Sequence, residues 1–211
     1  MQFDAALSDL EALSITPNPP EKLLFRQSQA FYHLQRFHDC CEVLKRLRMH
    51  YPDNVAATVE FSRAIKRLDE QLTGRYNFKK LYTEAVQSQP PHLDHATYIG
   101  PVSIKDSGIG GRGLFTTKAI KAGDLLLCEK AFAHAFVDDT HENPESGQDV
   151  TLLVNVATDR ITMGAQGDLI QMIVQKMYRN PSLASTITAL HHGAYKWDGI
   201  SMVDDTPVVD T

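Results

Sequence analysis

The sequence has no long apolar run. A transmembrane helix needs about 18 or more consecutive apolar residues, and no such stretch occurs among these 211 residues. The first residues, MQFDAALSDLEALS, are acidic and amphipathic, whereas a secretory signal starts with basic residues and continues with an apolar segment. We therefore expect an intracellular protein, in the nucleus or the cytoplasm, without a membrane partner.

Cysteine is scarce as well. Cys40 and Cys41 are adjacent and Cys128 stands alone, which supplies neither a disulfide framework nor a zinc motif. The nine histidines, among them His92 and His95, do not combine with cysteines or carboxylates at spacings that metal sites use. The sequence predicts no metal site.

A basic surface is also missing. The net charge of −5 and the isoelectric point near 6.0 argue against a broad nucleic-acid interface. Two basic clusters, 45–48 and 63–67, fall on predicted helices, and we interpret them as solvated faces. With 43% hydrophobic residues, the chain can form a core in one or two domains.

Glycines concentrate in residues 108–132, GIGGRGLFTTKAIKAGDLLLCEKAF. Gly110, Gly111 and Gly113 can adopt positive φ and leave the backbone open to a ligand. Residues 114–117 favour a strand, 122–124 a turn, and 125–136 a second, mostly apolar strand. A simple structural turn remains an alternative. The spacing is neither that of a P-loop nor that of a Rossmann turn.

The run Gly111-Arg112-Gly113-Leu114-Phe115, continued by residues 119–129, resembles the opening of a SET domain, the fold of protein-lysine methyltransferases. This resemblance implies that Gly111, Arg112, Gly113 and Leu114 lie beside S-adenosylmethionine. Together with the helical region before it, the segment is similar to fungal proteins of the SET/MYND-like family that join tetratricopeptide (TPR) repeats to a SET domain.

The later SET motifs have no counterpart in the chain. None of its asparagines is followed by histidine, whereas the family carries an Asn-His motif that contacts the cofactor. Tyr178 and Tyr195 do not match the family's catalytic tyrosine, so we assign no catalytic residue. The zinc-binding MYND cysteines are absent too. Thr206 and Pro207 have the pattern of a helix start with a short remainder, which indicates a truncated SET domain; a frayed terminus is the alternative.

A repeat occurs in the first half of the chain. A shift of 34 residues, the TPR period, carries six positions onto six others. Small residues recur at two predicted helix crossings, Ser28/Ser62 and Cys40/Gly74, and apolar residues recur between them. The matched sets are Leu24, Ser28, Phe31, Cys40, Leu44, Leu47 and Thr58, Ser62, Ile65, Gly74, Phe78, Leu81. A generic helical hairpin is the alternative.

These patterns predict an α+β protein. Residues 1–21 form an N-terminal segment, 22–90 TPR-like helical hairpins, 91–97 a linker and 98–211 a partial SET domain. Within the last part we expect strands over 98–136, beginning at 98–104, and a helical insert over 149–192. Helical spacing is found at 151–163 and 168–178, and another helix is predicted over 183–190.

Two functions are compatible with this organisation. The first is a TPR-SET lysine methyltransferase lineage that uses S-adenosylmethionine and is inactive as this chain, so that enzyme status itself stays open. The second is a non-enzymatic module that binds a peptide or protein through its helices. A fragment from an incomplete gene model is a further alternative. The sequence reveals neither the substrate lysine nor the oligomeric state.

Overall fold

The computed structural model describes residues 1–14, 18–88, 92–136, 151–155, 159–190, 202–203 and 206–207, with the backbone alone for 11–14, 202–203 and 206–207. Helices and short two-stranded sheets make up these residues, which confirms the predicted α+β class. The chain divides into two compact units, residues 6–130 and residues 1–5 with 131–211.

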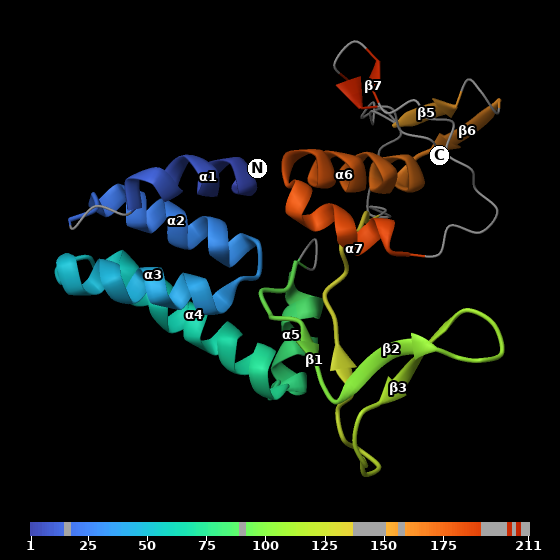
Figure 1. Ribbon diagram of the computed structural model, residues 1–211, viewed down its shortest axis with the longest axis horizontal. Helices are drawn as coiled ribbons and strands as arrows, with labels where there is room; N and C mark the ends of the chain where they lie inside the picture. Colours follow the sequence, from blue (N-terminus) through green and yellow to red (C-terminus); the bar gives the residue numbers. More distant parts are fainter. Residues whose placement is uncertain are drawn as a thin grey trace. The chain divides into compact units, whose positions relative to one another are not determined.

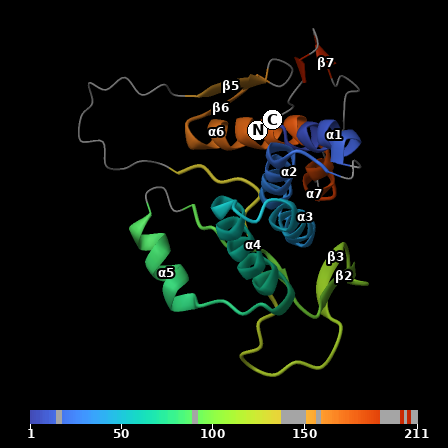
Figure 2. The ribbon, with the colours of Figure 1, turned by 90° about the vertical axis from the view of Figure 1, so that its left-hand side faces the viewer.

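Helices fill the first part of the chain. They are α1 (Phe3–Ser14), α2 (Glu21–His33), α3 (Phe37–His50), α4 (Val55–Thr73) and α5 (Phe78–Gln87). Helix α2 packs on α3, and α3 packs on α4. Figure 1 shows these three helices side by side, and Figure 2 shows α4 between α3 and α5.

The core of this unit lies between α2 and α3. Leu24, Leu44 and Leu47 are fully buried, and Ser28 and Cys40 are each 1% exposed. On α3 the buried residues recur at helical spacing, so that one face of the helix turns inward. The first predicted hairpin, with small residues among large apolar ones, is confirmed at these positions.

The buried face of α4 differs from the prediction by one residue. Ala57 and Ala64 are fully buried, and Phe61 and Leu68 pack partly against the core. The residues that the 34-residue shift selected, Thr58, Ser62 and Ile65, are exposed. A shift of 33 residues, from Leu24 to Ala57, would have found the correct face, so the predicted register is wrong here.

Gly74 is not a helix crossing. It ends α4 in the left-handed conformation, at φ 66°, and its N–H donates to Glu70 O at 2.9 Å, which is the usual role of a C-terminal glycine. Helix α5, which follows, has no buried residue. The predicted close packing of a second hairpin at Gly74 is therefore wrong.

Short strands follow the helices. β1 (Tyr98–Ile99) pairs with β4 (Leu127–Cys128), and β2 (Val102–Asp106) pairs with β3 (Arg112–Thr116), both antiparallel. The single strand predicted over 98–104 is divided at Gly100-Pro101, because proline cannot donate to a ladder. β1 is consequently short, and its partner covers 127–128 rather than the predicted 125–136.

The second unit contains a hairpin where a helix was expected. β5 (Leu152–Asn155) pairs antiparallel with β6 (Arg160–Met163), and Gly164 at φ 64° separates β6 from α6 (Ala165–Arg179). Short apolar runs fit either period, and β-branched Val154, Ile161 and Thr162 favour strands. The helix predicted over 151–163 is therefore wrong.

The helices predicted next in this unit are confirmed as α6 (Ala165–Arg179) and α7 (Ala184–Thr188), with a 3-10 turn at Pro181–Leu183 between them. Thr206 and Pro207 do not start a helix. They form β8, which pairs antiparallel with β7 (Met202–Val203); proline is tolerated there because both strands of a two-stranded sheet are edges. Tyr195 lies outside the described residues.

Candidate functional site

The glycines singled out by sequence lie in the loop between β2 and β3. Asp106 pairs with Arg112 at the end of the ladder, and the connection between them turns through Gly108, Gly110 and Gly111 at φ 71°, 121° and 72°. Side chains bridge this loop: Gly108 N–H donates to Asp106 Oδ1 at 2.8 Å, and Ser107 Oγ donates to Gly110 O at 2.9 Å.

The loop presents open backbone. A Cβ added to Gly108, Gly110 or Gly111 would meet no atom within 4 Å. Gly113 is different, because its Cβ would lie 3.0 Å from the ring of Phe115; there the missing side chain makes room for an aromatic ring. Positive φ explains why glycine is needed at 110 and 111.

Arg112 and Leu114 continue the loop as exposed residues of β3, with Leu114 53% exposed. An exposed apolar side chain, a guanidinium group and open backbone are thus neighbours at the start of this strand. The four predicted residues therefore lie together. They line neither the cavity between α4 and α5 nor the small cavity between α2, α3 and α4.

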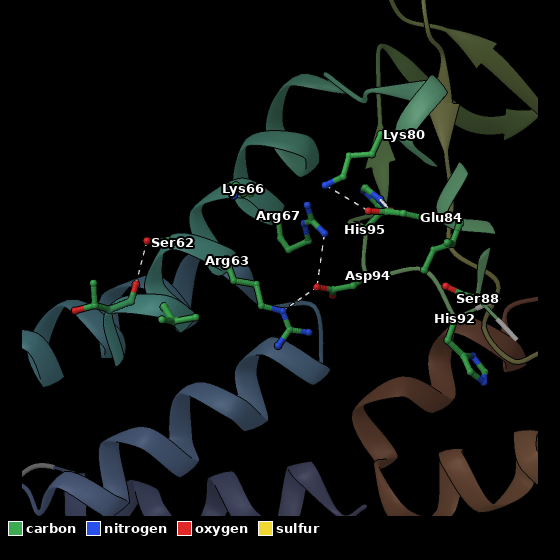
Figure 3. A pocket seen from close by; sticks show the side chains of 13 residues that line it. Ser62, Arg63, Lys66, Arg67, Lys80, Glu84, Ser88, His92, Asp94 and His95 are labelled. Carbon is green, nitrogen blue, oxygen red and sulfur yellow. Dashed lines mark hydrogen bonds and ion pairs between the residues drawn. The ribbon is translucent and has the colours of Figure 1, made fainter. Parts of the chain in front are cut away.

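A cavity of about 640 Å³ lies elsewhere in the same unit, between α4, α5 and the segment 92–95 (Figure 3). Its walls carry cationic side chains on α4 and α5 and acidic and histidine side chains on α5 and the segment. The lining residues are Thr58, Val59, Ser62, Arg63, Lys66, Arg67, Lys80, Glu84, Ser88, His92, Leu93, Asp94 and His95.

Asp94 anchors the segment to the helices. Tyr32 Oη donates to both carboxylate oxygens, at 2.8 and 2.9 Å, and Arg63 Nε donates to Oδ2 at 2.8 Å. Burial by itself would raise the pKa of Asp94, but the hydrogen bonds from Arg63 and Tyr32 outweigh it and hold that pKa below its usual value. Burial and Asp94 raise the pKa of Tyr32.

Glu70, His95 and Glu84 form a second link. His95 Nδ1 lies 2.9 Å from Glu70 Oε1, and His95 Nε2 lies 2.8 Å from Glu84 Oε2. Glu70 Oε2 also accepts from Ala96 N at 3.0 Å, and its Oε1 accepts from Arg67 Nη2 at 2.9 Å. Most of the charges in the cavity wall are thus paired with one another and hold the walls together.

Sequence reasoning missed this cavity. It interpreted Arg63, Lys66 and Arg67 as a solvated face and residues 91–97 as a plain linker. The spacing i, i+3, i+4 did show that the three cations share one side of a helix. No local pattern could show that Asp94 lies against that side, because its contact with Tyr32 spans 62 residues.

The residues that the structure describes include neither a cluster of metal ligands nor a membrane-spanning helix. They contain no group of three or more His, Cys, Asp or Glu side chains placed to hold a metal ion. No helix among them is long and apolar enough to cross a membrane.

Comparison with known proteins gives one informative similarity. The chain is 42% identical over 206 residues to a protein of the fungus Gibberella zeae that is named Methyltransferase. The alignment covers 98% of this chain and 28% of that protein, so the chain corresponds to a little over a quarter of its relative. No protein-family model and no solved structure matches the chain.

Proposed function

We propose that this chain is part of a fungal SET-type methyltransferase that transfers a methyl group from S-adenosylmethionine to a lysine of a protein substrate. One observation carries the proposal: the segment that resembles a SET opening, Gly111–Leu114, lies at an exposed turn into β3, where Gly111 and the preceding Gly110 face open space. The similarity to a protein named Methyltransferase over nearly the whole chain supports it.

In this proposal the chain's residues contribute one side of the cofactor site. The backbone at Gly111 and Gly113 approaches the ligand, Leu114 offers apolar surface, and Arg112 offers hydrogen-bond donors. Bound S-adenosylmethionine supplies an electrophilic methyl group on its sulfonium. Transfer requires a neutral lysine amine aligned with that methyl, and the helices of residues 22–90 act as a scaffold of the TPR type.

We further propose that the chain alone is inactive. No Asn-His pair occurs in the sequence, and the relative is more than three times as long as the aligned part. One wall of a site provides few contacts, while ordering a ligand costs several kcal/mol. We expect S-adenosylmethionine to bind weakly or not at all to this chain and measurably to a protein extended to the relative's length.

Calorimetry on the extended protein tests the assignment. Arg112→Ala and Leu114→Ala should each weaken S-adenosylmethionine binding roughly tenfold, about the effect of losing one good contact. Residues of β2 provide the controls. Lys105→Ala removes a cation opposite Gly113 and is the control for Arg112→Ala, and Ile104→Ala is the control for Leu114→Ala, because Ile104 pairs with Leu114 and the two side chains are 66% and 53% exposed. If all four variants bind S-adenosylmethionine with equal affinity, the proposal is wrong and the glycines only form a structural turn.

A second candidate is a protein-interaction module, and the cavity between α4 and α5 favours it. Its volume lies within the usual range for ligand sites of about 300–1,000 Å³, and Lys66 extends one wall. A lysine-containing substrate peptide added without cofactor would then shift NMR signals of the cavity residues. Shifts confined to the β2–β3 hairpin would instead favour the enzyme proposal.

A further inference from the structure

His95 stands between two carboxylates from different helices. Glu70 belongs to α4 and Glu84 to α5, and one ring nitrogen of His95 faces each of them, at 2.9 and 2.8 Å. The side chains of His95 and Glu70 are 13% and 10% exposed, and that of Glu84 is 35% exposed. The histidine therefore bridges a nearly buried acid and a more accessible one.

This geometry selects one protonation state. An ionised carboxylate only accepts hydrogen bonds, and a neutral imidazole donates from one nitrogen while the other carries a lone pair. Both contacts are favourable only when His95 is doubly protonated. With a neutral ring, a lone pair faces the oxygens of either Glu70 or Glu84, and that contact becomes repulsive.

Glu84 is the weaker partner of the two. Glu70 has further bonds, from Arg67 and from Ala96 N–H, which keep it in place. Glu84 has an ion pair with Lys80, on its own helix, at 3.3 Å. Loss of the His95 proton should therefore break the bond to Glu84 and spare the bond to Glu70.

Helix α5 depends on that bond. It has no buried residue. Leu81 and Ala85 are half-buried, and the larger apolar side chains Phe78, Tyr82 and Val86 are 57%, 72% and 61% exposed. Within the described part of the chain, the contact from Glu84 to His95 is the one side-chain hydrogen bond that ties α5 to residues outside the helix and its caps. Little hydrophobic packing would hold the helix if it were lost.

We propose that His95 is a pH-sensitive clasp, which holds α5 beside α4 and closes the cavity while its ring is doubly protonated, and releases α5 when the ring loses a proton. The proposal is independent of the methyltransferase assignment. The charged and titratable groups that face the ring are Glu70 and Arg67 from α4, Glu84 and Lys80 from α5, and Tyr76 from the connection between them.

The sign of the pH effect follows from these partners. The clasp is present at acidic pH and is lost as pH rises through the titration of His95. Its lower limit is set by Glu84, because the hydrogen bond from His95 outweighs burial and lowers the pKa of that carboxyl. Only below that pKa would protonation of Glu84 weaken the clasp from the acid side.

NMR of the 211-residue chain tests the proposal. Imidazole resonances report the titration of His95, and hydrogen exchange of the amides from Phe78 to Gln87, corrected for the intrinsic effect of pH, reports the opening of α5. We expect the opening equilibrium constant to rise at least about tenfold across the His95 titration, as for the loss of a charge-assisted hydrogen bond. Amides of α3 should show no such change.

Two variants and a control make the outcome decisive. His95→Gln cannot donate at both positions and should leave α5 open at every pH, while His50→Gln, at an exposed histidine of α3, should keep the native response. If His95→Gln does not fold, Glu84→Gln on the surface of α5 provides the same test and should also raise opening. An α5 that exchanges at the same corrected rate throughout the titration of His95, or that responds to pH unchanged in Glu84→Gln, overturns the proposal.

Discussion

The ring of Tyr98 occupies the space that a side chain at Gly74 would need. A Cβ built on Gly74 would lie 2.6 Å from Cε1 and 2.7 Å from Cδ1 of Tyr98. The end of α4 and the start of β1 therefore meet where residue 74 has no side chain. Both its conformation, at φ 66°, and this contact require glycine.

Gly74→Ala should lower the free energy of unfolding by about 2–5 kcal/mol, since left-handed backbone costs a residue with a Cβ about 1–2 kcal/mol and overpacking adds about 1–3 kcal/mol. Gly108→Ala is the matched control, because Gly108 has φ 71° and open space around it. Chemical denaturation of both variants separates the two costs. Equal losses would show that Tyr98 moves aside freely.

The helical repeat shows how far sequence reasoning reached. Between α2 and α3 the pattern of Leu24, Ser28 and Cys40 predicted the buried faces correctly, because large and small residues alternate there at helical spacing. The same shift failed for α4, whose inner face is formed mainly by Ala57 and Ala64. Alanine is only weakly hydrophobic, so the sequence pattern did not distinguish the face with Ala57 and Ala64 from the neighbouring face with Ile65.

Of the two candidate sites, one could be predicted from the sequence and the other could not. Gly111 to Leu114 are consecutive residues, so their proximity in a hairpin could be predicted from local turn chemistry. The cavity depends on Asp94 and His95 reaching helices that lie far away in sequence. Contacts of this kind follow from the tertiary fold and leave no periodic trace in the chain.

Because Cys40 is buried, we expect that a larger side chain at this position destabilises the fold and that its thiol reacts slowly. It is 1% exposed, and burial, with a smaller effect of Cys41, raises its pKa to about 12. Cys40→Leu should cost about 1–3 kcal/mol of stability by overpacking, whereas Cys40→Ala should cost less than a deletion of a large side chain. Thermal unfolding of the two variants measures the difference.

Thiol labelling gives an independent check. In the folded chain a disulfide reagent should modify the partly exposed Cys128 first, and Cys40 and Cys41, which are buried, at the rate of unfolding. Labelling of Cys40 as fast as Cys128 would contradict the packing of α2 on α3.

The stability of the fold should depend on pH through Asp94, which anchors segment 92–95. The pKa of Asp94 is lowered in the folded chain, so the ionised carboxylate stabilises the fold at neutral pH, and this stabilisation is lost as pH falls below the ordinary value of 3.8 and through the lowered pKa. Asp94→Asn should reduce stability at pH 7 and flatten the acid limb of the stability curve.

Tyr32→Phe separates the hydroxyl from the ring in that anchor. It removes the bonds from Tyr32 Oη to Asp94 and keeps an aromatic ring under Arg63, whose guanidinium carbon lies 4.3 Å from the ring centre. We expect a loss of about 1–3 kcal/mol, the range for a hydrogen bond to a charged group. A double-mutant cycle with Asp94→Asn should then show coupling between the two residues, and strict additivity would contradict the anchor.

Asn180 should stabilise the first turn of α1. Its Oδ1 accepts from Phe3 N at 2.7 Å and from Asp4 N at 3.3 Å, and its Nδ2 donates to Met1 O at 3.1 Å. The amide thus acts as a helix cap supplied from the end of α6. Asn180→Ala should cost about 1–2 kcal/mol and speed hydrogen exchange at the start of α1.

Asn180→Asp is the informative partner of this variant. It keeps the acceptor, adds a negative charge that the positive end of the helix favours, and removes the donor to Met1 O. Its first-turn amides should therefore remain more protected than those of Asn180→Ala. If both variants lose the same protection, the bond to Met1 O, rather than the cap at Phe3 and Asp4, holds the N-terminus, and the capping role of Asn180 is wrong.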